Sequence, residues 1–332
     1  MDSQKSFEYF CSLKPDLSAG TVSLYATSLK TSFRNACAKK DETELCQCLD
    51  DLSWIDLNAE NIITEMEVRF QNKNTLRSRI SHFTEVCKCL GFMKSWKTFS
   101  DKHKKLWKDL QSLPKQTRTA KQEEMKIEYT DFKSAVKKSQ KIANKILKED
   151  PNAETTEFDI YLMVQEALFL SIYFKFPLRR DIGDCSIIRN QDERRGKDLT
   201  KINYVERGVK GNKWYLFLNS FKNVKKVEKK DRIFDLGKQI GKYLNWIANS
   251  KINNTDSLLL NQKRQRMTRD TFSKLFQDTN ERYTGKRSRN NDWRSSVVSF
   301  HFKDDTSLDE REKLAKKMTH STTTQMLHYE KK

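Results

Sequence analysis

The first third of the chain carries apolar residues at the spacing of amphipathic helices. In the first predicted helix the apolar stripe includes Val22, Tyr25 and Leu29, and Ser18 stands where an N-cap residue is expected. Gly91 is expected to end the fourth helix, because glycine readily takes the left-handed conformation that follows a helix. The predicted helices are Ala19–Cys37, Thr43–Leu49, a helix from about Asn58 through Val68, Thr75–Leu90 and Asp101–Leu110. This pattern predicts a small helical bundle.

The pattern changes after the polar stretch 114–126. A helix predicted over Glu157–Phe174 is apolar on nearly every face, so it belongs at the centre of a second domain. Short runs rich in strand-forming residues then predict the strands Ile202–Val205, Trp214–Leu218 and Arg232–Phe234, with a turn between the first two. The other predicted helices of this region are Thr130–Lys148, Gly237–Ala248, Thr268–Arg282, Asn290–Phe302 and Leu308–Lys317.

These elements predict a fold that is mainly α with a small antiparallel β-sheet. A length of 332 residues suits two domains rather than one. Leu113-Pro114 ends the first helical pattern, and the residues that follow are polar, basic and rich in Thr and Gln, as in a linker. We therefore expect a helical domain over residues 1–113, a basic linker over 114–126 and an α+β domain over 127–332.

The charge balance points to a polyanionic partner. Lysine and arginine outnumber aspartate and glutamate by 64 to 45, which gives a formal charge of +19 and a pI near 9.5. A membrane surface is the competing polyanion, but the sequence has no basic amphipathic helix, lipidation signal or membrane-spanning run. The basic residues are spread over the whole length, which favours double-stranded DNA. Because Met1–Lys5 lacks the apolar core of a secretory signal, we expect an intracellular protein that acts at DNA, is not secreted and binds no membrane.

The cysteines and histidines of the first domain do not form a convincing metal motif. Seven cysteines are present, and the pairs Cys46-x-Cys48 and Cys87-x-Cys89 are tighter than usual zinc knuckles and lie in helix-like sequence. They are interpreted as small buried hydrophobic residues, and His82 and His103 as structural. No metal or other cofactor is therefore predicted.

Basic clusters supply the candidate DNA contacts. Those of the second domain are expected mostly to position the phosphate backbone rather than read bases. For the first-domain cluster a solvated helix face is the first explanation, and phosphate contact is the alternative that the overall charge favours. The basic linker could also lie along the phosphate backbone. The predicted contacts are Lys73, Arg77 and Arg79 in the first domain, Lys115 and Arg118 in the linker, and Arg264, Arg266, Arg287 and Arg289 in the second domain.

The candidate chemistry is concentrated near the C-terminus. The hydroxyl-rich stretch Met318–Tyr329 ends in a tyrosine, with His320 nine residues before it. Taken alone, Tyr329 is better explained as a packed aromatic ring. Cations nevertheless precede it in the order that a phosphodiester-cleaving tyrosine requires, namely Arg179, Lys222 and Arg294.

Arg179 and Lys222 each come soon after a predicted element, Arg179 after a buried helix and Lys222 after a strand. Arg179 follows a buried helix, so its guanidinium needs a partner, either a carboxylate such as Asp181 or Asp184 or a ligand phosphate. Arg180 competes for the same role, although the preceding Pro-Leu favours Arg179. Lys222 follows the second predicted strand on a turn, from which a lysine can reach a groove beside a duplex.

These motifs together resemble the catalytic domain of tyrosine recombinases, the phage-integrase family. The resemblance rests on Leu178-Arg179, the Lys222 turn, Asn291-Asp292-Trp293-Arg294-Ser295, Met318-Thr319-His320-Ser321 and Tyr329, and it covers about Ile127 to the C-terminus. The helical first domain looks like the core-binding domain of that family. Two positions depart from the family pattern: Asn291 stands at the usual first histidine, and Thr319 replaces the common glycine before His320.

The resemblance implies a site-specific recombinase or integrase that needs neither metal nor ATP. Tyr329 would attack a DNA phosphate to form a 3′-phosphotyrosyl link, while Arg179 and Arg294 stabilise the transition state and Lys222 protonates the 5′-oxygen. His320 would hydrogen-bond the phosphate or help to deprotonate Tyr329, and Asn291 can only donate or accept a hydrogen bond. The implied assembly is a homo-tetramer on two DNA sites, formed from free monomers or dimers, that integrates or excises a viral or mobile element. A type IB topoisomerase-like enzyme and a catalytically inactive DNA-binding relative are the alternatives.

Overall fold

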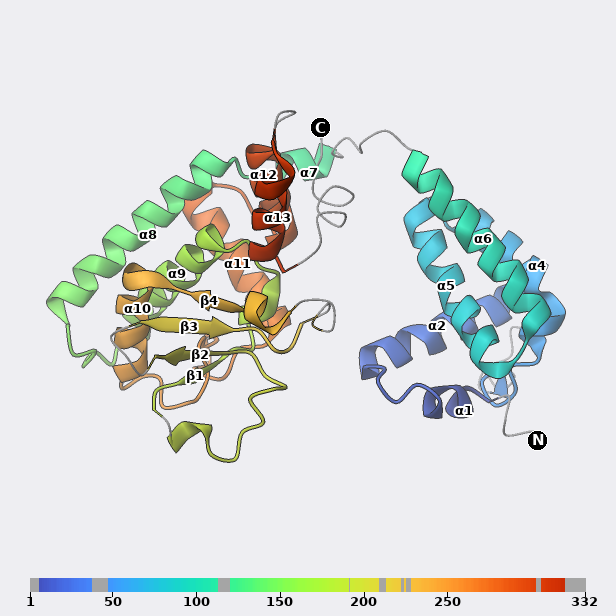
Figure 1. Cartoon of the computed structure of the whole chain (residues 1–332), viewed down its shortest axis with the longest axis horizontal. Helices are drawn as coiled ribbons and strands as arrows, with labels where there is room; N and C mark the ends of the chain where they lie inside the picture. Colours follow the sequence, from blue (N-terminus) through green and yellow to red (C-terminus); the bar gives the residue numbers. More distant parts are fainter. Residues whose placement is uncertain are drawn as a thin grey trace. The chain divides into compact units, whose positions relative to one another are not determined.

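Two hydrophobic cores organise the chain, one within Met1–Pro114 and the other within Lys115–Lys332 (Figure 1). The two units are described separately. The structure, a computed structural model, describes residues 6–37, 47–112, 120–190, 192–208, 213–221, 224, 228–302 and 306–319. Within these ranges no helix is both long enough and apolar enough to cross a membrane.

The first unit consists of helices in the residues described. Ser18 accepts a hydrogen bond from the backbone N–H of Thr21 (3.2 Å), so the predicted N-cap is confirmed. Gly91 ends its helix at φ +75°, in the left-handed region, as its position predicted. The elements are α1 (Phe7–Ser12), α2 (Ala19–Ala36), α4 (Trp54–Arg69), α5 (Lys73–Leu90) and α6 (Met93–Ser112).

Aromatic rings join three of these helices in the core of the first unit. Phe83 on α5 is fully buried and lies 6.4 Å from the ring of Trp54 on α4 and 5.2 Å from the ring of Phe99 on α6. His82 is also buried: it stacks on Tyr25 and hydrogen-bonds Ser28 Oγ (3.0 Å) on α2. Its surroundings are structural, as the sequence indicated.

One predicted helix start is confirmed in part, and another is wrong. The element α4 begins at Trp54 but is kinked at Asn58, which has the non-helical φ of −124° and whose side chain donates to the Trp54 carbonyl (2.8 Å), so a helical segment begins after Asn58 as predicted. Helix α6 begins at Met93 rather than Asp101, directly after the Gly91 turn. Most of the helix predicted over Thr43–Leu49 lies outside the described residues.

The second unit combines helices with a small sheet, and the fold class predicted from the sequence is confirmed. A short helix, α7, lies in the segment where a linker is expected. The helices are α7 (Ala120–Glu124), α8 (Tyr129–Glu149), α9 (Phe158–Lys175), α10 (Gly237–Asn249), α11 (Arg269–Thr284), α12 (Asn290–His301) and α13 (Leu308–Lys317), with 3-10 turns η2 (Arg180–Ile182), η3 (Asp192–Arg194) and η5 (Lys229–Arg232).

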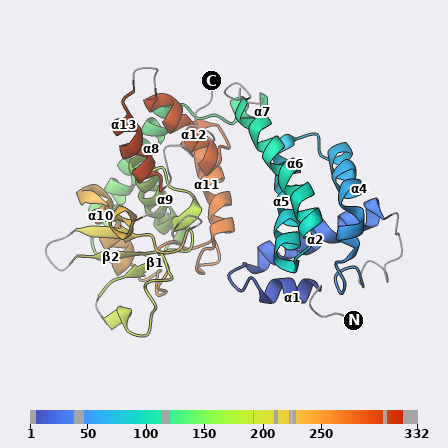
Figure 2. The same ribbon diagram turned by 45° about the vertical axis from the view of Figure 1, so that its right-hand side comes forward.

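Helix α9 lies at the centre of this unit, packed against α8 and α10. It is buried from Val164 to Tyr173, as its apolar pattern predicted. Its buried Gln165 side chain is satisfied by the backbone of Leu260, accepting from the N–H (2.7 Å) and donating to the carbonyl (3.0 Å). In Figures 1 and 2, α12 and α13 lie side by side, and Val298, Phe302 and Met318 form their shared apolar contact.

The sheet is mixed rather than purely antiparallel, which corrects one part of the prediction. Its order is β1-β2-β3-β4; β1 pairs with β2 in parallel, and the other pairs are antiparallel. Strand β1 was missed because it is three residues long and buried throughout, so it shows no alternation of polar and apolar positions. The strands are β1 (Ser186–Ile188), β2 (Tyr204–Arg207), β3 (Trp214–Phe217) and β4 (Ile233–Asp235).

Candidate active site

Arg179 lies in the short segment between α9 and η2. Its carbonyl accepts a hydrogen bond from Tyr173 Oη, and burial raises the pKa of that phenol well above its usual range, so the phenol stays protonated. The Arg179 side chain is half-buried, and its Nη1 is buried with no hydrogen-bond partner in the described chain. A buried donor without a partner is costly, so this position favours an anionic ligand.

Arg294 lies in the second turn of α12 and is fully buried. Its Nη1 donates to the Pro177 carbonyl (2.7 Å) and its Nη2 to the Met318 carbonyl (3.1 Å). The neighbouring Trp293 donates from Nε1 to the Tyr173 carbonyl (3.1 Å). One guanidinium therefore ties α12 both to the segment that carries Arg179 and to the residue at the end of α13.

Asp181 is the common neighbour of the two arginines. Its carboxyl is buried, and burial raises its pKa above the usual range, while the charges of Arg269, Arg294 and Arg179 act in the opposite direction. One of its oxygens, Oδ2, has no hydrogen-bond partner among the described residues. The Asp181 carboxyl thus lies within electrostatic range of three guanidiniums, of which Arg179 is one.

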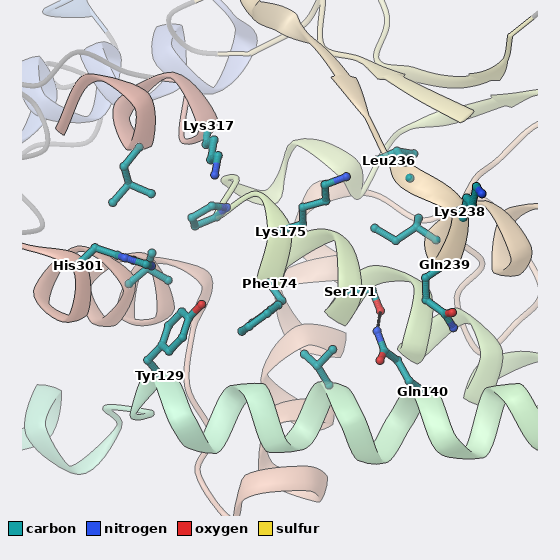
Figure 3. A pocket seen from close by; sticks show the side chains of 16 residues that line it. Tyr129, Gln140, Ser171, Phe174, Lys175, Leu236, Lys238, Gln239, His301 and Lys317 are labelled. Carbon is teal, nitrogen blue, oxygen red and sulfur yellow. Dashed lines mark hydrogen bonds between the residues drawn. The ribbon is translucent and has the colours of Figure 1, made fainter. Parts of the chain in front are cut away.

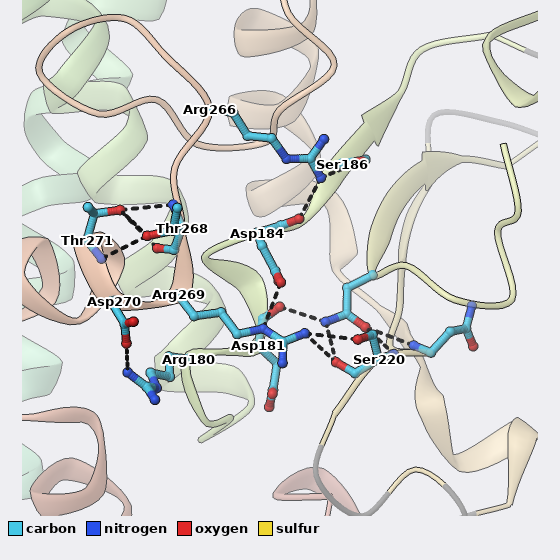
Figure 4. A network of polar contacts seen from close by, with 12 residues as sticks. Arg180, Asp181, Asp184, Ser186, Ser220, Arg266, Thr268, Arg269, Asp270 and Thr271 are labelled. Atoms are coloured by element: carbon cyan, nitrogen blue, oxygen red, sulfur yellow. Dashed lines mark hydrogen bonds and ion pairs between the residues drawn. The ribbon is translucent and has the colours of Figure 1, made fainter. Parts of the chain in front are cut away.

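A polar network surrounds this group (Figure 4). Arg180 pairs with Asp270 at the surface, so it points to a different partner from Arg179. Arg269, the first residue of α11, forms an ion pair with Asp184 (2.8 Å) and donates to the Ser220 carbonyl (2.6 Å). The sequence indicated only that Arg269 belongs to a basic surface, because the positions of Asp184 and Ser220 beside it depend on the tertiary fold.

The two asparagines at the start of α12 have different surroundings. Asn291, the predicted site residue, is exposed. Asn290 is buried, and neither its Oδ1 nor its Nδ2 has a hydrogen-bond partner in the residues described. The polar side chain with unmet hydrogen bonds one turn before Arg294 is therefore Asn290, which the family pattern did not single out.

Lys222, His320 and Tyr329 lie outside the described residues. The last described residue before His320 is Thr319, which is buried and has φ +56°. Glycine tolerates this left-handed conformation easily, whereas a β-branched residue rarely adopts it. Position 319 thus has a backbone conformation at which glycine is expected rather than threonine.

Several of the predicted DNA contacts are engaged in ion pairs within the chain. Lys115 and Arg118 lie outside the described residues. The pairs are Lys73–Asp109 at 3.5 Å, Arg266–Asp256 at 3.1 Å, Arg287–Asp278 at 2.5 Å and Arg289–Asp292 at 3.0 Å. Because these pairs are partly exposed, they are weak, and a phosphate can compete for the cation.

The guanidiniums of the other predicted DNA contacts lie mainly against aromatic rings or donate to a hydroxyl. The Arg77 guanidinium lies 4.3 Å from the ring centroid of Trp107 on α6. Arg79 donates to Ser28 Oγ (2.7 Å), and Arg264 lies 5.3 Å from the ring centroid of Phe158.

A groove of about 500 Å³ opens beside Pro177, between α8, α9, α10, α12 and α13 (Figure 3). Lys175, Lys238, Lys317 and His301 contribute its basic side chains, and no carboxylate is found among the described residues that line it. The groove is compatible with anions, but Arg179, Asn291 and Arg294, the predicted catalytic residues that the structure describes, do not line it. No group of three or more His, Cys, Asp or Glu side chains in the described ranges is arranged to hold a metal ion.

Comparisons with known proteins give little beyond this geometry. No protein-family model matches the sequence, and no curated protein matches it. Among solved structures, one described as "Crystal structure of XerA recombinase" is similar over 98% of this chain and 93% of that chain, with 11% sequence identity and a TM-score of 0.36. A likeness this distant supports no conclusion about activity, so any function has to be argued from the side chains.

Proposed function

We propose that this chain is a tyrosine recombinase that cuts and rejoins double-stranded DNA through a 3′-phosphotyrosyl intermediate. The observation that carries the proposal is the convergence of Arg179 and Arg294, which are 115 positions apart in the sequence. Arg294 donates to the carbonyl of Pro177, two residues before Arg179, and both guanidiniums act on the carboxyl of Asp181. A half-buried guanidinium near a fully buried one suits a phosphate with two non-bridging oxygens.

The charge of the cluster supports a phosphodiester ligand. Arg179, Arg269 and Arg294 contribute three positive charges, and Asp181 and Asp184 at most two negative ones, which leaves a net charge of at least +1. Burial favours protonation of Asp181, which would raise the net charge further. The Nη1 of Arg179 supplies a donor that has no partner in the described chain.

The proposed reaction is an in-line displacement at phosphorus. The Tyr329 oxygen forms a bond to phosphorus as its proton passes to His320, and the bond from phosphorus to the 5′-oxygen breaks. Lys222 gives a proton to the departing oxygen, which leaves a free 5′-hydroxyl. Arg179 and Arg294 stabilise the charge that develops on the non-bridging oxygens. Attack of a 5′-hydroxyl on the phosphotyrosine reverses every step, so no external energy source is required.

Cleavage is tested with a nicked or suicide duplex in EDTA, followed by denaturing electrophoresis. The expected product is a covalent protein–DNA adduct that is absent in Tyr329→Phe. The absence of any adduct on a broad set of duplexes, including junctions of the element that encodes the protein, would favour a DNA-binding protein without catalysis. Relaxation of supercoiled DNA without joining of two duplexes would instead favour a topoisomerase.

Arg179 and Arg180 provide a matched pair of variants. Arg179→Ala is expected to reduce the cleavage rate by about 100-fold or more, because one stabilising donor of the transition state is lost. Arg180→Ala is expected to reduce it by less than about 10-fold, because the Arg180 side chain pairs with Asp270 at the surface. A larger loss in Arg180→Ala would reassign the first catalytic arginine.

Binding to DNA is expected to weaken steeply with salt, because each phosphate contact releases counterions. Removing one contacting cation, such as Arg287 with Arg287→Gln, should reduce the slope of log K against log salt by about 1. An unchanged slope would show that Arg287 stays with Asp278 and does not contact DNA. Recombination also implies four protomers on two sites, which sedimentation of the DNA complex tests.

A further inference from the structure

We infer that Arg269 and Asn203 are positioning residues that hold the turn at Asn219–Ser220 against the segment carrying Arg179. In this way they control protonation of the departing 5′-oxygen. The inference rests on the proposed function, and it extends that function to two side chains whose hydrogen bonds go to neighbouring groups of the chain.

Arg269 makes the first of two links. Its Nε pairs with the Asp184 carboxylate (2.8 Å), in the turn after Arg179. Its Nη2 donates to the Ser220 carbonyl (2.6 Å) and lies 3.2 Å from Ser220 Oγ (Figure 4). One planar guanidinium at the start of α11 thus spans the Arg179 segment and the turn that follows β3, a task for which its fork of donors is well suited.

Asn203 makes the second link and is 2% exposed. Its Oδ1 accepts from the backbone N–H groups of Asn219 (2.9 Å) and Ser220 (2.8 Å). Its Nδ2 donates to the carbonyls of Asp181 and Ser220, at 2.9 Å each. All four hydrogen-bonding positions of the amide are used, so the side chain has one orientation and joins the same two segments as Arg269.

Each link holds a residue that lies close in the sequence to a proposed catalytic residue. Asp181 follows Arg179 by two residues, and Lys222 follows Ser220 by two residues. A general acid works only within hydrogen-bond reach of the atom that it protonates, and a misplacement of about 1 Å can cost about 100-fold in rate. The links therefore hold the turn that precedes Lys222 in the sequence against the segment that carries Arg179.

The test compares two DNA substrates, one with the normal 5′-bridging oxygen and one with sulfur in its place. A thiolate leaves without needing a proton, so the sulfur substrate bypasses the general acid. Arg269→Gln and Asn203→Ala are each expected to slow cleavage of the oxygen substrate by about 100-fold and that of the sulfur substrate by less than about 5-fold. Lys222→Ala should show the same selective rescue, and Arg194→Gln, which removes a partly exposed ion pair with Glu206 on β2, should affect neither substrate.

Equal loss on both substrates in Arg269→Gln and Asn203→Ala would overturn the inference while leaving the proposed function intact. Hydrogen exchange of the Asn219 and Ser220 amides tests the links without any DNA. Exchange should accelerate at least about 10-fold in Asn203→Ala, because those amides lose their acceptor. Unchanged exchange would overturn the inference alone, whereas the absence of any adduct from the wild-type protein would overturn both the inference and the proposed function.

Discussion

Gly183 offers a sharp test of how closely the Arg179 segment packs on α11. A Cβ atom at this position would lie 2.7 Å from Phe272 Cβ, 3.0 Å from Arg269 Cα and 3.1 Å from Phe272 Cγ. Its φ of −63° is ordinary for any residue, so the cost of Gly183→Ala is steric and not conformational. The perturbation therefore reports on packing alone.

The neighbours of Gly183 have little room to move. Phe272 is fully buried, and its ring lies 5.5 Å from Phe169 and 5.6 Å from Tyr173, both on the central helix α9. Contacts of 2.7 to 3.0 Å are about 0.5 to 1 Å shorter than the favourable separation of carbon atoms. Overpacking of a rigid core typically costs about 1–3 kcal/mol, and we expect Gly183→Ala to fall in this range.

The assay is native-state hydrogen exchange resolved by peptide, because it reports separately on each unit. Amides of α9 and α11 should lose about 1–3 kcal/mol of protection in Gly183→Ala. Gly20→Ala is the matched control: Gly20 lies in α2, and a Cβ there would meet nothing within 4 Å. That variant should stabilise its helix by up to about 1 kcal/mol, since alanine is the better helix former. Wild-type protection of α9 and α11 in Gly183→Ala would refute the close packing.

Three further predictions concern buried titratable groups. Burial lowers the pKa of His82 to about 4, below its unfolded value of 6.5, so the stability of the first unit should be retained above pH 6.5 and fall as the pH drops towards 4. The loss should reach at most about 3 kcal/mol in urea unfolding, and His82→Gln should lose less stability than the wild type over this range, although His103, whose pKa burial also lowers, still titrates. Burial raises the pKa of Cys87 to about 12, so iodoacetamide at pH 8 should label Cys11 well before Cys87; equal rates would contradict the buried thiol. Glu166→Gln should cost less than about 1 kcal/mol in thermal unfolding, because the Arg282 side chain is 61% exposed and stays hydrated without its partner; a loss above about 3 kcal/mol would contradict this.

The helices were largely predictable because their apolar stripes and caps are local signals. At Asn58 the local signal marks a kink at which one helical segment ends and the next begins, and only the preceding segment from Trp54 was not predicted. Strand β1 depends on parallel pairing with β2, a long-range contact that leaves no periodic trace in three buried residues. Element type was therefore easier to predict than element boundaries or strand direction.

The candidate site residues remain predictions, and the contacts that connect them could not be predicted from the sequence. Arg179 and Arg294 were singled out by their order before Tyr329 and by the family resemblance, and in the structure both guanidiniums lie near the Asp181 carboxyl. Asn203 could not be identified from the sequence, because its proposed role depends on four hydrogen bonds to backbone groups that come together only in the folded chain. Asn290 is buried and Asn291 is exposed because of the way in which α12 is rotated about its axis against the rest of the unit. The sequence alone does not determine this rotation.

Trp293 gives the proposed site its own optical reporter. The indole is fully buried, lies 3.8 Å from the Phe132 ring by centroid distance, and precedes Arg294 directly in α12. Any movement of that helix that frees Arg294 from the Pro177 and Met318 carbonyls would also alter the environment of the indole. Emission from this one tryptophan, isolated by replacing the others with phenylalanine, would therefore record in real time whether a bound duplex shifts α12.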